Sequence, residues 1–484
     1  MRFKGLAVVT LLVACPLAVS TFADDAKKGT PDVSKDEKNS FTTIAGKFAG
    51  LAKYCTGQNA FSDAKAQIDL GLELAPDSEV LKKLKADLKD TGKPPSIEWK
   101  KKGADRIASS HKEIADELAK LIKLCTKKGV LDHFEDRVEF LTSALGADGA
   151  IAGAVWFEPY RKWVTEQDKA KLDAGCENID GKWLKPEQVA DLDKKHSTFD
   201  SPWVFSDDIH EIKTNISYRE AIQVYNHVHA YTQFFLRKFG DEWELKSNDQ
   251  KLPIIVTAKQ DDFKNEIKKR GLNPDDQRLN MEAVYYHGDP GPVFATKEPR
   301  SEGGAVFDAP LPEVMNVLQH EITHELCFEF SRFAQGSGGA HANKWAVEGF
   351  ATYMQSWVRD KKGWHFVCPN PKNHEKGDGL DYWLAECKDD PTYPQRLEGF
   401  FEFSNDNFKA KDYNFGAGIC YFLLDGQGGK YRTPMIKCLS LIHQNKATKQ
   451  SMKECLKDYK LDDVDREYRS FISGVKLEEP ANKN

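Results

Sequence analysis

The sequence predicts an α+β protein in which a helical N-terminal region precedes a domain built on a twisted sheet. Apolar residues in the region 43–150 recur at the spacing of amphipathic helices. From about Ser206 onward, short apolar runs typical of strands alternate with longer amphipathic segments. The 484 residues also exceed what one ordinary hydrophobic core organises, so we expect several domains.

Composition and charge exclude several classes of protein. The chain is 40% hydrophobic and 30% charged, which is typical of folded proteins and unlike disordered or membrane proteins. A formal net charge of -6 provides no basic field for a phosphate backbone, so we expect no nucleic-acid partner. No segment reaches the roughly 20 apolar residues that a membrane-spanning helix needs, so we expect no membrane span.

The N-terminus has the layout of a cleavable signal peptide over residues 1–23. A basic start precedes the apolar run Gly5–Val19, and the small residue Ala23 precedes two aspartates. This layout predicts a secreted or periplasmic protein. The alternative is lipoprotein anchoring at Cys15, which is disfavoured because Pro16 would follow the lipidated cysteine.

Cysteine usage is compatible with an oxidising compartment but predicts no cysteine metal site. The chain has ten cysteines, so nine remain after loss of Cys15, and an odd number cannot all pair within one chain. None forms a CxxC, which argues against a cysteine zinc ribbon. A disulfide between Cys368 and Cys387 is one candidate pairing, whereas Cys55, Cys125 and Cys327 are better interpreted as small buried apolar residues.

The segment 24–42 is polar and aperiodic, and we interpret it as a flexible linker before the helical domain 43–150. Two short antiparallel helices are expected first, with one apolar face on each, and they end at Ala75-Pro76. The face residues are Phe48, Leu51, Ala52 and Cys55, followed by Ala64, Ile68 and Gly71.

That spacing resembles one tetratricopeptide repeat, with a weaker echo over 118–134. Stacked repeats normally need at least three units to bury their faces. Two interpretations of residues 43–150 therefore stay open. One is a prodomain or spacer, and the other is a binding region for a peptide or protein partner.

Residues 151–205 carry many aromatics but also Gly181, Pro186 and Pro202, so they are predicted to be a linker that packs partly on its neighbours. The domain 206–475 follows. Its expected strands are 209–216, 252–258, 283–287 and 304–308, the last two joined by a Gly/Pro loop, and its expected helices include 218–239 and 262–269.

The chemistry of the chain is concentrated in His320-Glu321-Ile322-Thr323-His324, inside a predicted helix that Pro312 can open. Residues four apart lie on one helix face, about 6 Å apart along the axis, so both imidazoles can reach one ion. Glu321 borders that face and is placed to take a proton from water.

A catalytic zinc site requires three protein ligands and an open fourth position for water. Glu348 is the candidate third ligand, on a second helix where the small residues Gly349 and Ala351 allow close approach. Chance alone would place an HExxH in roughly three such chains in a hundred. The added glutamate, 24 residues after His324, makes an accident much less frequent.

These residues resemble the gluzincin metallopeptidases, the thermolysin-like group, and most closely the peptidase MA-like domains of secreted bacterial proteins. The resemblance covers about residues 206–461 and is most specific at 320–325 and 345–353. It implies a Zn²⁺ enzyme that hydrolyses peptide bonds. In that enzyme His320, His324 and Glu348 are the metal ligands and Glu321 is the general base. The chain departs from thermolysin in having Thr352 where an acid orients a ligand histidine, which leaves that partner unassigned.

Tyr413 is the candidate donor to the oxyanion that develops in peptide hydrolysis. It opens Tyr413-Asn-Phe-Gly416, which looks like the Tyr-x-x-Gly segment of some gluzincins. The alternative is an aromatic that packs at a helix entrance. The remaining candidate histidines are expected on the surface or in loops, namely His341, His365, His374 and His443, while His227 and His229 should point to opposite helix faces.

Two functions are compared on this basis. The favoured one is a secreted zinc metallopeptidase acting on a peptide or protein substrate. The rival is a non-catalytic protein of gluzincin fold that recruits a partner through its N-terminal helices. A purely structural zinc site is disfavoured because such sites are closed by four ligands, usually including cysteine. In the peptidase, we expect the edge strand 304–308 to align an extended peptide.

Overall fold

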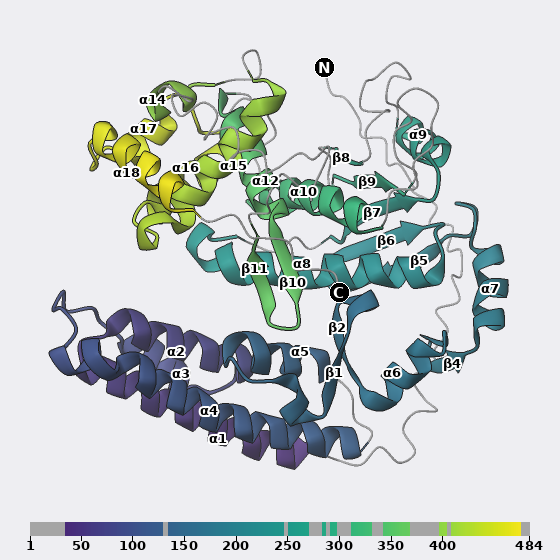
Figure 1. Ribbon diagram of the computed structural model, residues 1–484, viewed down its shortest axis with the longest axis horizontal. Helices are drawn as coiled ribbons and strands as arrows, with labels where there is room; N and C mark the ends of the chain where they lie inside the picture. The colour runs from purple at the N-terminus through teal and green to yellow at the C-terminus, as the bar shows by residue number, and fades with distance from the viewer. Residues whose placement is uncertain are drawn as a thin grey trace, which may run out of the picture. The chain divides into compact units, whose positions relative to one another are not determined.

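The structure is a computed structural model that describes residues 34–128, 134–245, 250–270, 283–286, 291–297, 311–331, 342–367, 396–403 and 408–475. The predicted signal peptide, the strand 304–308 and the Cys368–Cys387 pairing lie outside these residues. The chain divides into two compact units between Gly153 and Ala154 (Figure 1).

The first unit is helical throughout its described part. Its helices are α1 (Ser34–Gly57), α2 (Phe61–Leu74), α3 (Glu79–Asp87), α4 (Ile97–Lys127) and α5 (Phe134–Glu139), followed by a π-helical turn (Phe140–Ala144) and a 3-10 turn (Gly149–Ala152). The predicted apolar faces of α1 and α2 are buried, and α2 ends before Ala75-Pro76 as expected. A Cβ at Gly71 would lie 2.9 Å from the Phe48 Cβ, so the small residue is what allows these two helices to pack closely.

Helix α1 begins at Ser34, inside the segment interpreted as a flexible linker. Asp36 and Glu37 occupy its first turn, where carboxylates favour helix formation by interacting with the helix dipole. Both also pair with distant cations, Asp36 with Lys128 at 3.0 Å and Glu37 with Arg137 at 2.8 Å. The helix therefore extends further than its apolar periodicity predicts.

The segment 151–205 is more regular than a linker. It contains the hairpin β1 (Ala154–Phe157) and β2 (Lys162–Thr165), helix α6 (Glu166–Asp173), the hairpin β3 (Glu177–Ile179) and β4 (Lys182–Leu184), and helix α7 (Pro186–Lys195). The glycine and proline that suggested a linker lie at a turn and at a helix start within these elements. Gly181 takes a positive φ of 76° in the turn between β3 and β4, and Pro186 begins α7, where its missing N–H costs nothing.

A five-stranded mixed sheet organises the second unit. Its strands, in spatial order, are β5 (Trp203–Ser206), β6 (His210–Thr214), β7 (Leu252–Thr257), β9 (Val293–Thr296) and β8 (Ala283–Tyr285). Strands β6, β7 and β9 are parallel, while β5 and β8 pair antiparallel at the two edges. The predicted strands 209–216, 252–258 and 283–287 are confirmed with slightly shorter bounds.

Strand β9 was not predicted, because it falls in the stretch interpreted as a Gly/Pro loop. Four residues are too short to show a period, and all four are buried between β7 and β8. The pairing begins at Pro292, whose carbonyl accepts the Tyr286 N–H at 3.0 Å. On this side of the described sheet the edge strand is therefore β8.

Both faces of the sheet are covered by helices (Figure 1). One face, including Ile254 and Val256, packs on α8 (Tyr218–Trp243) and α10 (Leu311–Phe330) in the main core. The other, including Ile255 and Phe294, packs on α9 (Gln260–Lys269). Alternate strand residues thus face opposite helical layers, as the period of two requires.

The elements after α10 add a hairpin and a group of helices. They are α12 (Lys344–Gln355), β10 (Trp357–Asp360), β11 (Gly363–Phe366), α14 (Leu397–Phe400), α15 (Ala410–Asp425), α16 (Arg432–His443), α17 (Ser451–Cys455) and α18 (Leu461–Gly474). The fold is therefore mixed helix and sheet, as the α+β prediction requires. Among the described helices, none is long and apolar enough to cross a bilayer.

Candidate metal centre

Helices α10 and α12 bring His320, His324 and Glu348 together. The His320 and His324 Nε2 atoms lie 3.1 Å apart, and each lies 3.4 Å from Glu348 Oε2. Their ligand atoms are all within 4.8 Å of one another, the arrangement of a group that could hold a metal ion. The side chains are 13%, 11% and 17% exposed, so the group is sheltered but open to solvent.

The triangle has the size that a first-row metal requires. Three ligands at tetrahedral angles, about 2.0 to 2.1 Å from a zinc ion, are separated by about 3.3 to 3.4 Å. The observed separations of 3.1, 3.4 and 3.4 Å are close to that value. Two imidazoles and one carboxylate are also ligands that zinc accepts. The residues present therefore fit the predicted ion.

Electrostatic interactions within the group shift the pKa values of His320 and Glu348 toward their charged forms. Burial would lower the pKa of His320, but the hydrogen bond with Glu348 and the nearby charge of Glu321 outweigh it and raise the pKa. Burial would raise the pKa of Glu348, but hydrogen bonds from both histidines hold it well below its usual 4.5. The carboxylate is thus kept ionised, the form in which it can bind a cation.

Two buried side chains of α10 fix this helix against its neighbours. The Gln319 amide donates to the carbonyls of Met354 at 2.6 Å and Trp357 at 3.1 Å, beside the end of α12. Thr323 Oγ1 lies 2.6 Å from the Tyr231 hydroxyl on α8. These contacts flank His320 in the sequence, so they set its position relative to the helix that carries Glu348.

On its other side, α12 packs on α15 with almost no side chain between the two backbones. A Cβ at Gly349 would lie 2.4 Å from the carbonyl carbon of Gly416. A Cβ at Gly416 would lie 2.7 Å from the Trp345 carbonyl oxygen. Gly349 does allow a close approach, but to α15, the helix that carries Tyr413, and not to the motif helix as predicted. Glu348 precedes this contact by one residue, so the contact helps to place the carboxylate.

Glu321 faces the edge strand β8. Its Oε2 accepts the Tyr285 backbone N–H at 2.7 Å. Two turns further along α10, Glu329 accepts the Tyr285 hydroxyl at 2.9 Å and the Gly291 N–H at 2.8 Å. The strand is therefore held to the motif helix through both backbone and side chain. Sequence reasoning missed Glu329, although its spacing of eight residues from Glu321 marks the same helix face.

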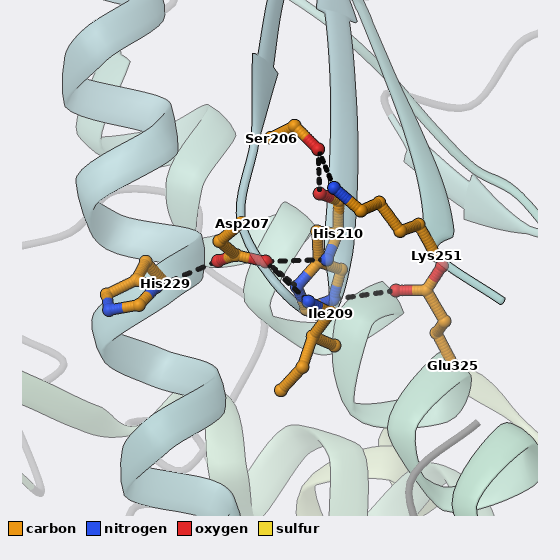
Figure 2. A network of polar contacts seen from close by, with 7 residues as sticks. All are labelled: Ser206, Asp207, Ile209, His210, His229, Lys251 and Glu325. Atoms are coloured by element: carbon orange, nitrogen blue, oxygen red, sulfur yellow. Dashed lines mark hydrogen bonds and ion pairs between the residues drawn. The ribbon is translucent and has the colours of Figure 1, made fainter. Parts of the chain in front are cut away.

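Behind the ligands, Glu325 pairs with a histidine of the sheet (Figure 2). Its Oε2 lies 3.4 Å from His210 Nε2, and both side chains are at most 1% exposed. Asp207 accepts the backbone N–H of His210 at 2.6 Å and lies 2.8 Å from His229 Nδ1. Burial raises the pKa of Glu325 to about 7 although His210 opposes the shift. This acidic residue therefore connects α10 to β6.

Two further residues contact the ligands and were not singled out from sequence. Gln355 hydrogen-bonds to His320, which supplies a partner where Thr352 offers no acid. Such partners orient a ligand imidazole. The Lys344 Nζ lies 3.5 Å from Glu348 Oε1, so the two imidazoles contact one carboxylate oxygen and a lysine lies beside the other. Both residues share a face of α12 with Glu348, at helical spacings of seven and four.

Tyr413 lies in the first turn of α15, half-buried, with its ring 4.9 Å from that of Phe408. The Lys344 Nζ lies 6.0 Å from the Tyr413 ring, so the tyrosine is near the residue that pairs with Glu348. These contacts are those of an aromatic side chain that packs at the start of a helix, which is the alternative interpretation of Tyr413. A role toward an oxyanion stays a prediction.

The other described histidines lie as predicted, with the exception of His443. His443 is buried and bonds the Leu439 carbonyl at 2.8 Å, which differs from the surface position expected. His365 is 42% exposed beside Asp360. His227 is buried against Trp364 while His229 faces Asp207, so the two do point apart. His341 and His374 lie outside the described residues.

Comparison with known proteins provides no relative: the chain matches no protein-family model and no curated protein.

Proposed function

We propose that this chain is a zinc metallopeptidase of the gluzincin type, with His320, His324 and Glu348 as ligands and Glu321 as general base. The single observation behind the proposal is the triangle of two imidazole nitrogens and one carboxylate oxygen, with edges of 3.1 to 3.4 Å. Glu321, on the same helix as the two histidines, is close enough for its charge to raise the pKa of His320. The three ligands and the second acidic group, Glu321, together are the parts that metal-dependent hydrolysis requires.

When bound, zinc would supply a Lewis acid and lower the pKa of water to about 7. The chain's own residues do the rest. Glu321 takes the proton from the attacking water and delivers it to the leaving amine. The Tyr285 N–H, which donates to Glu321 Oε2 at 2.7 Å, holds one carboxylate oxygen and leaves the other for the proton. Gln355 orients the His320 ring, and Lys344 holds the second oxygen of Glu348.

The proposed substrate is a peptide or protein. Tyr413 is retained as the candidate donor to the oxyanion, and residues 43–150, with their tetratricopeptide-like spacing, as a candidate site for a protein partner. Secretion or export to the periplasm is part of the proposal because of the signal-like sequence at residues 1–23.

The test combines metal analysis of the purified mature protein with digestion of a peptide library at several pH values. We expect one zinc per chain and cleavage that falls at least about 100-fold in Glu321→Gln, the usual size of a general-base contribution. Glu321→Gln should retain its zinc. The matched control is Glu454→Gln, because Glu454 is an exposed glutamate on α17.

The outcomes separate the two functions. Zinc without Glu321-dependent cleavage, including after removal of residues 24–150, would favour the non-catalytic binding protein. Absence of any stoichiometric metal in wild type, after reconstitution with zinc, would overturn the peptidase proposal.

A further inference from the structure

Two cysteines far from the candidate metal centre lie in contact in the second unit. Cys438 is on α16 and Cys455 ends α17, and the two helices pack against each other. Their thiols lie close enough for a hydrogen bond between them to be the largest influence on the pKa of each. Cys438 is fully buried in the core, whereas Cys455 is partly exposed at its margin.

The turn between the two helices is held in place by its backbone. The amides of Lys446 and Ala447 both donate to the Leu441 carbonyl, at 2.9 and 3.1 Å. Asn445 adopts the left-handed φ of 54° that reverses the chain, and Thr448 and Ser451 form two hydrogen bonds with each other. The turn that brings α17 back onto α16 is therefore ordered, and it keeps the helices that carry the two cysteines packed together.

The pair is chemically unequal in a way that suits thiol exchange. The hydrogen bond from Cys438 lowers the pKa of Cys455, although burial opposes the shift. The same hydrogen bond and burial raise the pKa of Cys438 well above 9.0. Cys455 is thus the better thiolate and also the accessible one, which makes it the attacking sulfur, with Cys438 the resolving partner.

We propose that Cys438 and Cys455 form a disulfide bond by exchange with a disulfide oxidant such as oxidised glutathione. The Cys455 thiolate attacks one sulfur of the oxidant, its S–S bond breaks, and one glutathione thiolate leaves. Cys438 gives its proton to water and attacks the Cys455 sulfur, and the second glutathione thiolate leaves. The two protein thiols lose two electrons and two protons, and the oxidant gains them as two thiols.

Other cysteines are poorer candidates for the same bond. Within the described part of the chain, Cys420 on α15 is the other cysteine close enough to affect Cys438 electrostatically. It is fully buried, and burial raises its pKa well above 9.0. A disulfide oxidant cannot reach the buried Cys420 sulfur, and the raised pKa keeps Cys420 in the unreactive thiol form. We therefore expect Cys420 to stay reduced.

The bond would brace a turn that contacts the metal-ligand helix. The Asn343 side-chain amide donates to the Thr448 carbonyl at 3.1 Å, and Asn343 immediately precedes α12, which carries Glu348. Closing the loop between residues 438 and 455 restricts the unfolded chain and so stabilises the fold. This inference does not depend on the peptidase proposal, since it concerns only the redox state of two thiols.

Peptide mapping tests it on the full mature protein. The protein is incubated with oxidised glutathione, alkylated with iodoacetamide without reduction, and digested with trypsin. Cleavage after lysines releases residues 438–446 and 454–457, each with one cysteine, and residues 412–430 with Cys420. We expect a cross-linked 438–446/454–457 species, lighter than the two reduced peptides by two hydrogen atoms. Alkylated Cys438 and Cys455, or a 412–430/438–446 cross-link, would overturn the proposal.

Thermal unfolding provides a second readout. Reductant should lower the Tm of the oxidised wild type by several degrees, since a closed loop of this length is a substantial restraint. Cys455→Ser should show no reductant-dependent shift, whereas Cys176→Ser, which alters another partly exposed cysteine of the same unit, should shift as wild type does. A reductant-dependent shift retained in Cys455→Ser would contradict the assignment.

Discussion

Replacing Gly349 with alanine tests how the Glu348 helix is placed. The new Cβ would lie 2.4 Å from the Gly416 carbonyl carbon and 2.7 Å from its Cα and oxygen. Ordinary contacts between such atoms begin near 3.4 Å, so α12 and α15 must separate by about 1 Å. The atoms that must move belong to a helix backbone, which cannot swing aside as a flexible side chain can.

The expected loss is set by two opposing effects. Overpacking of this kind costs about 1 to 3 kcal/mol, while alanine gains up to about 1 kcal/mol of helix propensity over glycine. We therefore expect Gly349→Ala to lower the free energy of unfolding by about 1 to 2 kcal/mol. Metal sites tolerate errors of only about 0.2 Å, so a helix displaced by about 1 Å should weaken zinc binding at least tenfold.

Urea denaturation and zinc titration against a chelator measure the two quantities. Gly240→Ala is the matched control, because Gly240 is also helical and a Cβ there meets nothing within 4 Å. That variant should be as stable as wild type or more stable by up to about 1 kcal/mol. If Gly349→Ala behaved like Gly240→Ala in both assays, the close backbone contact would not be what positions Glu348.

Three further predictions concern side chains around the site. Burial and nearby arginine charges lower the pKa of His227 from 6.5 to about 3, so below pH 6.5 the unfolded chain binds a proton that the folded chain does not. The free energy of unfolding should therefore fall as pH falls from about 6.5 toward 3, by up to about 1.4 kcal/mol per pH unit. Urea titrations of metal-free protein at about pH 6.5 and 5 measure this fall, which should be smaller in His227→Gln than in wild type. Gln355→Leu removes the hydrogen bond to His320 and should weaken zinc binding about 10- to 100-fold by chelator competition, with unchanged affinity counting against an orienting role. Tyr285→Phe removes a bond to the Glu329 carboxylate and should cost about 1.5 to 3 kcal/mol in urea denaturation, while a loss below about 0.5 kcal/mol would show that this bond does not anchor β8.

Local patterns were enough to predict the two helices that carry the candidate site and the residues of the ligand group. A spacing of four residues places His320 and His324 on one face of any α-helix, whatever surrounds it. The helix spans around 44–74 and 218–243 likewise follow from apolar residues that recur within a few turns. These features depend on neighbours in the chain, which the sequence displays directly.

The tertiary structure decided which residues support that group. Glu325 pairs with His210 across 115 residues of chain, and Gly349 meets Gly416 across 67. The short strand β9 exists because β7 and β8 pair with it on both sides. Such contacts join residues that are far apart in the chain and share no repeating pattern. For each of these residues, many other partners would fit the local sequence equally well. Which of them form is therefore decided by how the whole core packs, because burial and hydrogen bonding are satisfied for all the elements together.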